Sequence, residues 1–160
     1  MNKLLSVIVV LGLLFVGLQY VKKDSADVVQ AEVTESSVAS ELIVDRASHD
    51  FGEIGLRDGV VSTVFIVTNV GDEDVAVING TTSCGCTSAE LQGVSFGMHQ
   101  EMDREVVIPS GGSQELTVIY DPMAHGPSGV GLANRKVFLK TNSTQTPELS
   151  VDISALVVNK

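Results

Sequence analysis

From residue 41 to the C-terminus, short runs rich in Val, Ile, Thr and Phe alternate with turns rich in Gly, Asn, Asp and Pro. This alternation is the signature of antiparallel strands in a sandwich. The run at residues 60–69 carries apolar side chains on both faces, so it is expected to be a central strand, with Phe65, Val67 and Asn69 on one of those faces. The sequence therefore predicts an all-β, immunoglobulin-like antiparallel β-sandwich of about seven to nine strands, preceded by one N-terminal apolar helix.

The strand-like runs are separated by two long Gly-rich excursions, at residues 89–101 and 121–133. No amphipathic helical stripe of useful length interrupts the runs. The expected strands are residues 42–45, 47–54, 60–69, 75–78, 81–88, 105–108, 114–120, 135–141 and 148–158.

The N-terminus has the pattern of a membrane segment. Residues 4–20 are apolar except for Ser6, Gln19 and the glycines, which is near the lower limit for a membrane-spanning helix. A cleaved signal peptide is the alternative, but the residues directly after the run make a poor cleavage site and Ala31 lies far downstream. We expect a signal anchor at residues 1–23, a flexible linker at 24–40 and the sandwich at 41–160.

These assignments imply a location. An uncut export signal leaves the C-terminal domain outside, so we expect a single-pass protein of the cell membrane, held through residues 4–20, with an extracytoplasmic domain. If the segment is cleaved instead, the domain is secreted.

The exported part is strongly acidic. Removing Lys3, Lys22 and Lys23 from the ten bases leaves seven against twenty acids, a formal charge of −13. Such a surface repels phosphate backbones, so nucleic acid is not an expected partner.

Five sequence elements in order resemble one bacterial family. They are His49-Asp50-Phe51-Gly52-Glu53-Ile54, the run from Phe65 to Gly71, Ser83-Cys84-Gly85-Cys86-Thr87, Ile108-Pro109-Ser110-Gly111-Gly112 and Val118-Ile119-Tyr120-Asp121-Pro122. Together they resemble domain-of-unknown-function family 1573, which is similar to the Hydin and major-sperm-protein type of immunoglobulin-like sandwich. The resemblance implies an exported or envelope-located sandwich and implies no activity.

Cys84 and Cys86 are the only cysteines, and Gly85 separates them. In an extended strand their Cα atoms lie about 6.6 Å apart on one face, which is at the upper end of the disulfide range. Gly85 allows the backbone to fold and shorten that gap. Two thiolates that chelate one metal tolerate the separation better, because their sulfurs need not touch.

The two excursions hold further soft ligands. Beyond Met1, the methionines lie in them or, for Met102, directly after the first, and two of the three histidines lie in them. Loops at one end of a sandwich converge although they are distant in sequence. Thiolate, thioether and imidazole together favour Cu(I), with zinc second. The candidate metal ligands are Cys84, Cys86, Met98, His99, Met102, Met123 and His125.

Two alternatives for the cysteines stay open, namely a Cys84–Cys86 disulfide and a pair of inert thiols. The sequence contains no nucleophile elbow and no phosphate-binding loop. Disulfide-exchange enzymes usually place their thiol at a helix N-terminus, and no helix is predicted here. We therefore expect a metal-binding module and not an enzyme. The alternative is a structural or interaction domain with an envelope protein as partner.

Overall fold

A computed structural model of the chain describes residues 37–160. The predicted anchor at residues 1–23 and most of the predicted linker lie outside the described residues. Within residues 37–160, no helix is long and apolar enough to cross a membrane.

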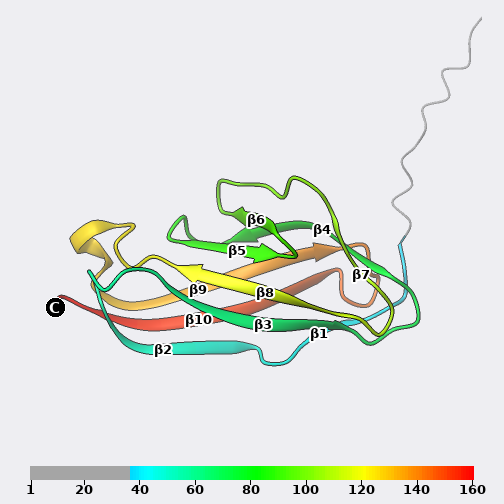
Figure 1. Ribbon diagram of the computed structural model, residues 1–160, viewed down its shortest axis with the longest axis horizontal. Helices are drawn as coiled ribbons and strands as arrows, with labels where there is room; N and C mark the ends of the chain where they lie inside the picture. Colours follow the sequence, from blue (N-terminus) through cyan, green and yellow to red (C-terminus); the bar gives the residue numbers. More distant parts are fainter. Residues whose placement is uncertain (1–36) are drawn as a thin grey trace, which may run out of the picture. The chain divides into compact units, whose positions relative to one another are not determined.

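Two five-stranded sheets pack face to face (Figure 1). The first sheet has the order β1 (Leu42–Val44), β3 (Val61–Asn69), β8 (Ser113–Tyr120), β5 (Thr87–Leu91) and β6 (Val94–Gly97). The second has the order β2 (Ser48–Gly55), β10 (Glu148–Val158), β9 (Gly131–Thr141), β4 (Val75–Thr82) and β7 (Val106–Ile108). Neighbouring strands are antiparallel except β2 and β10, which are parallel. The predicted all-β sandwich is confirmed, but with ten strands in the described residues.

The extra strand, β6, comes from the first predicted excursion, at residues 89–101. Most of that segment is a hairpin of β5 and β6, in which Leu91 pairs with Val94 and Ala89 with Phe96. Its two-residue turn places Gln92 at φ 50° and Gly93 at φ 76°. A turn with both φ values positive matches the twist of paired strands, but Gln is an uncommon residue at its first position, so the hairpin signal was missed.

The second excursion, predicted at residues 121–133, is shorter than expected. A short 3-10 helix, η2 (Gly126–Gly129), follows β8, and β9 begins at Gly131. Leu132 is 73% exposed although it pairs with Leu156 of β10. Because the outer face of a strand needs no apolar pattern, the start of β9 carried little hydrophobic signal.

The core lies between the two sheets and is formed by alternating residues of each strand. On β3 the predicted face is confirmed, because Phe65, Val67 and Asn69 are all buried. The buried amide of Asn69 donates to the carbonyl oxygens of Glu73 and Ile108, at 2.8 and 2.9 Å. A polar side chain therefore stays in the core because its hydrogen bonds are made.

The domain's contacts begin ahead of residue 41. The N–H of Val38 donates to the carbonyl of Asn142 at 3.1 Å, and Val38 forms a parallel bridge with Ser143. The chain thus enters the domain beside the end of β9.

Gly80 of β4 faces the aromatic ring of Phe96 in the opposite sheet. A Cβ atom at this position would lie 2.6 Å from two ring carbons of Phe96. No real Cβ contact is that short, so only glycine lets the two sheets approach here. Phe96 is fully buried and has little room to move.

Replacing this glycine is therefore expected to overpack the core. We expect Gly80→Ala to lower the free energy of unfolding by about 1–3 kcal/mol, measured by urea denaturation. Gly85→Ala is the control, because its Cβ would meet only His99, at an ordinary 3.7 Å. Equal stability of the two variants would contradict the close approach.

Asp45 joins the β1–β2 connection to β3. Its carboxylate accepts the N–H of Ile66 at 2.8 Å and pairs with Arg46 at 2.6 Å. The backbone hydrogen bond from Ile66, followed by the charge of Arg46, holds the pKa of Asp45 below its usual value in spite of partial desolvation. A lowered folded-state pKa contributes stability above the unfolded value and loses it as the pH falls through the folded value.

Asp45→Asn is therefore expected to flatten the acid side of the stability profile. Wild-type protein should lose part of its stability below about pH 4, whereas the variant should already lack that contribution at pH 7 and lose less on acidification. Thermal unfolding between pH 2 and pH 7 measures both curves. Asp103→Asn, at a 76% exposed carboxylate, is the control.

Candidate functional site

The two cysteines lie in a tight turn where the chain passes from one sheet to the other. β4 ends at Thr82 in the second sheet and β5 begins at Thr87 in the first. We call residues 83–86 between them the cysteine turn. Residues 81–88 were expected to be one extended segment. The two ends are strand, but residues 83–86 are not, because the N–H of Thr87 donates to the carbonyl of Cys84 at 3.1 Å and closes a turn.

Cys84 and Cys86 form a disulfide in this turn, with their Cα atoms 5.2 Å apart. The folded backbone brings them closer than the extended spacing of about 6.6 Å, into the usual disulfide range. The spacing expected for an extended strand disfavoured the disulfide because it did not include this turn.

Hydrogen bonds from three strands hold the cysteine turn. The buried Thr82 hydroxyl lies 3.0 Å from the carbonyl of Cys84 and 2.9 Å from that of Thr87. On β9, Lys136 exchanges two hydrogen bonds with Ser83, each at 2.9 Å. The N–H of Asp121, just after β8, donates to the carbonyl of Cys86 at 2.9 Å. The sulfurs therefore sit on a rigid backbone.

His125 lies against the disulfide. Its Nε2 atom is 3.2 Å from the Sγ of Cys84. The ligand atoms of Cys84, Cys86 and His125 all lie within 4.8 Å of one another. The loop that carries His125 is shaped by Asp121, whose carboxylate accepts the N–H of Met123 at 2.8 Å.

Arg135 contacts the other sulfur. Its Nε donates to the Sγ of Cys86 at 3.0 Å, and its guanidinium carbon lies 6.0 Å from the ring centre of Tyr120. Burial raises the pKa of Tyr120, against the charge of Arg135, so its phenol stays neutral at pH 7. Arg135 was not among the predicted site residues, because only the pairing of β9 with β4 brings it to the cysteines.

The other predicted ligands are placed differently. The imidazole of His99 lies over Gly85, with Cδ2 and Nε2 at 3.7 and 3.9 Å from the point where a Gly85 side chain would begin. Met98 and Met123 are exposed, and Met102 packs against the core. Both predicted loops thus bring a histidine to the cysteine turn, whereas Met102 serves packing.

The two sulfurs differ in exposure. Cys86 is 3% exposed and belongs to the core, whereas Cys84 is only partly buried and borders the exposed His125. The positive charge of Arg135 lies beside the Sγ of Cys86, and the imidazole of His125 lies beside the Sγ of Cys84.

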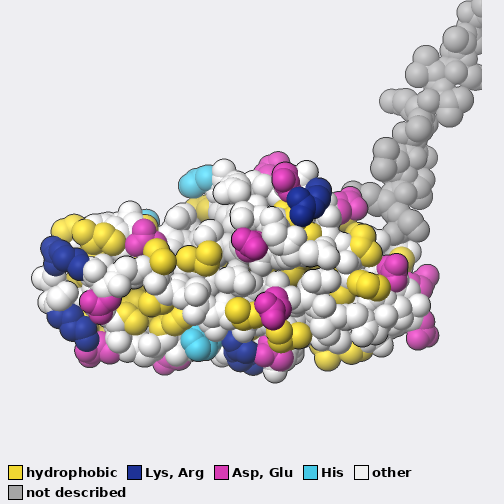
Figure 2. Space-filling view, viewed as in Figure 1, with side chains coloured by type: hydrophobic (Ala, Val, Ile, Leu, Met, Phe, Trp, Pro, Cys, Tyr) yellow, Lys and Arg dark blue, Asp and Glu magenta, His cyan; other side chains and the backbone are white. Residues whose placement is uncertain are grey.

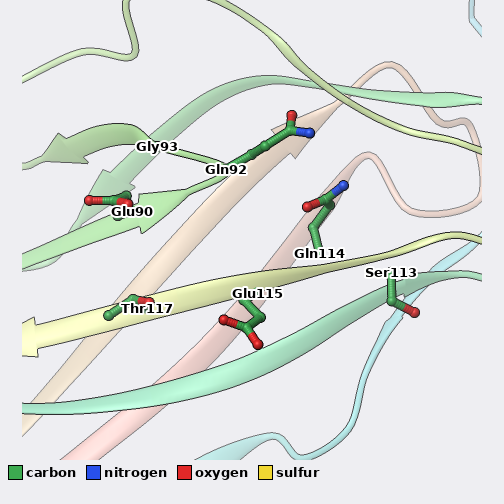
Figure 3. A pocket seen from close by; sticks show the side chains of 7 residues that line it. All are labelled: Glu90, Gln92, Gly93, Ser113, Gln114, Glu115 and Thr117. Atoms are coloured by element: carbon green, nitrogen blue, oxygen red, sulfur yellow. The ribbon is translucent and has the colours of Figure 1, made fainter.

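A second concavity lies elsewhere on the first sheet. It is a shallow, open depression on the outer face of β5 and β8 (Figure 3), and its lining contains no cysteine or histidine. Acidic side chains are scattered over the visible face of the domain and form no single patch there (Figure 2). The lining residues of the depression are Glu90, Gln92, Gly93, Ser113, Gln114, Glu115 and Thr117.

A comparison with protein families finds one match. The family described as "Protein of unknown function (DUF1573)" matches residues 42–157, which is most of the chain and includes the cysteine turn. The chain belongs to this family. The resemblance expected from the five sequence elements is thereby confirmed, and the family's description assigns no activity. No curated protein matches the chain.

Solved structures share the sandwich architecture of this DUF1573 member. A protein of unknown function from Porphyromonas gingivalis W83 superimposes with a TM-score of 0.58 at 18% identity, over 78% of this chain and 50% of that one. The chain thus spans about half the length of that relative. PapD-like domain 7 of human CEP192 gives a TM-score of 0.49 at 13% identity, covering 76% and 88% of the two chains. SSP-19, an MSP-domain protein of Caenorhabditis elegans, gives 0.44 at 12% identity, covering 71% and 97%.

The disulfide closes a loop of only three residues, so its entropic effect on the unfolded chain is small. We expect reduction to lower the free energy of unfolding by about 1–2 kcal/mol and to leave the sandwich folded. Thermal unfolding followed by circular dichroism, with and without a dithiol reductant, measures this. The Cys84→Ser/Cys86→Ser double variant should match the reduced protein, and cooperative unfolding on reduction at 25 °C would contradict the expectation.

Proposed function

We propose that this protein is a non-catalytic, membrane-tethered extracytoplasmic module that binds a soft metal ion through Cys84, Cys86 and His125. The supporting observation is that one ligand atom from each of these residues lies within 4.8 Å of the other two. Ligand atoms around a single metal lie at such separations, because metal–sulfur and metal–nitrogen bonds are about 2.3 and 2.0–2.1 Å long. The role would be metal capture or delivery at the cell surface.

The donor set favours Cu(I), with zinc second. Two thiolates and one imidazole are soft and borderline ligands, and Cu(I) prefers the softer ones. The disulfide must first be reduced, because sulfurs bonded to each other are not thiolate ligands. Binding therefore belongs to the dithiol form of the protein.

Two further residues can complete the coordination. The imidazole of His99 lies over Gly85, between the two cysteines in sequence, and the exposed Met123 stands two residues before His125. Either side chain would have to turn toward the sulfurs to act as a further ligand. Met98 is exposed, and Met102 would have to leave the core to act as a ligand.

The position of the site suits a tethered protein. The predicted linker enters beside Asn142, whereas the cysteine turn is bound to Lys136 on the same strand, about 20 Å away along β9. A domain attached at Val38 therefore presents the sulfurs away from its attachment point.

A structural or interaction role is the second candidate, and the disulfide itself supports it. In that case the bond only locks the turn between the sheets. The edge strands β1, β6, β2 and β7 would then offer unpaired backbone groups to an envelope partner.

Anaerobic titration with Cu(I) against a competing chelator separates the two candidates. Fully reduced full-length protein should bind one Cu(I) ion, and Cys84→Ser or Cys86→Ser should each abolish competitive binding. His125→Ala should weaken binding by at least about tenfold, equivalent to about 1.4 kcal/mol. His99→Ala and Met123→Leu show whether a fourth ligand contributes.

His49→Ala is the matched control, because His49 packs edge-on to Phe51 on β2, away from the cysteine turn. It should bind Cu(I) like the wild type. Equal affinity of the wild type and the two cysteine variants would overturn the metal site and leave the structural role.

A further inference from the structure

The disulfide is asymmetric in its access to solvent. Cys86 is 3% exposed and lies beneath the turn, with its Sγ 3.7 Å from the hydroxyl of Thr87. Cys84 is partly exposed, and the exposed imidazole of His125 lies beside its Sγ. An incoming thiolate must approach the sulfur it attacks in line with the S–S bond, so access decides which sulfur reacts.

Each sulfur also has its own hydrogen-bond donor. Arg135 Nε donates to Cys86 Sγ at 3.0 Å, and the N–H of Cys86 donates to Cys84 Sγ at 3.2 Å. A charged donor on a sulfur stabilises the negative charge that develops there when its bond breaks. The buried sulfur is therefore the better leaving group, and the accessible sulfur is the better target.

We propose that the Cys84–Cys86 disulfide is a thiol-operated gate, opened by attack of an external thiolate on Cys84 with Arg135 holding the departing Cys86 thiolate. This regulation rests on the proposed metal site, because opening the gate creates the dithiol ligands. The direction of the exchange itself depends only on the exposure and the contacts of the two sulfurs.

The chemistry balances with thiols as the co-reactant. A thiolate RS⁻ forms a bond to Cys84 Sγ, the Cys84–Cys86 bond breaks, and the electron pair leaves on Cys86 Sγ beside Arg135. A second thiolate then attacks the R sulfur, which releases RS–SR and leaves Cys84 as a thiolate. The Sγ of this thiolate accepts the hydrogen bond from the N–H of Cys86. Two thiols are oxidised to one disulfide, and the protein disulfide takes up the two electrons.

The thiol donor can be a small molecule or a dithiol protein, and two arms of one experiment distinguish them. The oxidised full-length protein is mixed with reduced glutathione in one arm, and with thioredoxin that lacks its resolving cysteine in the other. The reaction is quenched with acid and N-ethylmaleimide, and the adducts are mapped by fragmentation mass spectrometry. We expect the thiol donor on Cys84 and the maleimide on Cys86 in whichever arm reacts faster. If the thiol donor is found predominantly on Cys86, or if neither arm gives a mixed disulfide, the proposed gate is overturned.

The role of Arg135 as a positioning residue has its own test. Arg135→Gln should slow opening of the disulfide by glutathione about tenfold, as expected for loss of one charge-assisted hydrogen bond, and Arg135→Lys should recover part of the rate. Arg57→Gln is the matched control, because Arg57 is exposed and donates to Asn159 at 3.0 Å, not to a sulfur. Circular dichroism confirms folding of each variant, and an unchanged rate in folded Arg135→Gln would overturn this role.

The outcomes separate the gate from the metal site. Cu(I) titration uses protein that is already reduced, so it contains no disulfide to open. Glutathione mapping uses oxidised protein without metal, so it is independent of metal affinity.

Discussion

The crossing from β4 to β5 is the constraint on which the candidate site depends. The chain leaves the second sheet at Thr82 and enters the first at Thr87, so four residues must carry it from one layer to the other. The hydroxyl of Thr82 lies within hydrogen-bond distance of the carbonyls of both Cys84 and Thr87 at that corner. Because the connection is so short, both cysteines are held between the end of β4 in one sheet and the start of β5 in the other.

The same corner explains why neighbours come from several strands. β8 ends and β9 begins beside the turn, which brings His125 from the loop between them and Arg135 from β9. The loop after β6 brings His99 over Gly85. A sandwich collects residues from distant segments at such a corner without any helix, and the sulfurs acquire an imidazole on one side and a guanidinium on the other.

The chemistry of this corner has two states that share the same atoms. With the sulfurs joined, the turn is closed and the stabilising effect of the bond is small, because the loop it closes has three residues. In the proposed function, reduction of the sulfurs would make two thiolates and His125 a compact ligand set. A disulfide that contributes little to the stability of the fold and lies beside a charged donor is better suited to redox regulation than to a purely structural role.

The sequence alone determined the fold class, the face of β3 that packs in the core and the family, because each depends on local alternation or on short motifs. It also marked Cys84, Cys86, His99 and His125 as chemistry-bearing residues, since thiols and imidazoles stand out in any sequence. Residues 89–101 and the start of β9 were harder, because an uncommon Gln-Gly turn and exposed strand positions carry weak signals.

Only the tertiary structure decided which candidates meet. Met102 is partly buried and packs against the core, and Arg135, which nothing in its local sequence marks, contacts a sulfur. The physical reason is that the pairing of β4 with β9 sets these neighbours, and it brings together Cys86 and Arg135, which are 49 residues apart in sequence. Neither composition nor local periodicity encodes such a register.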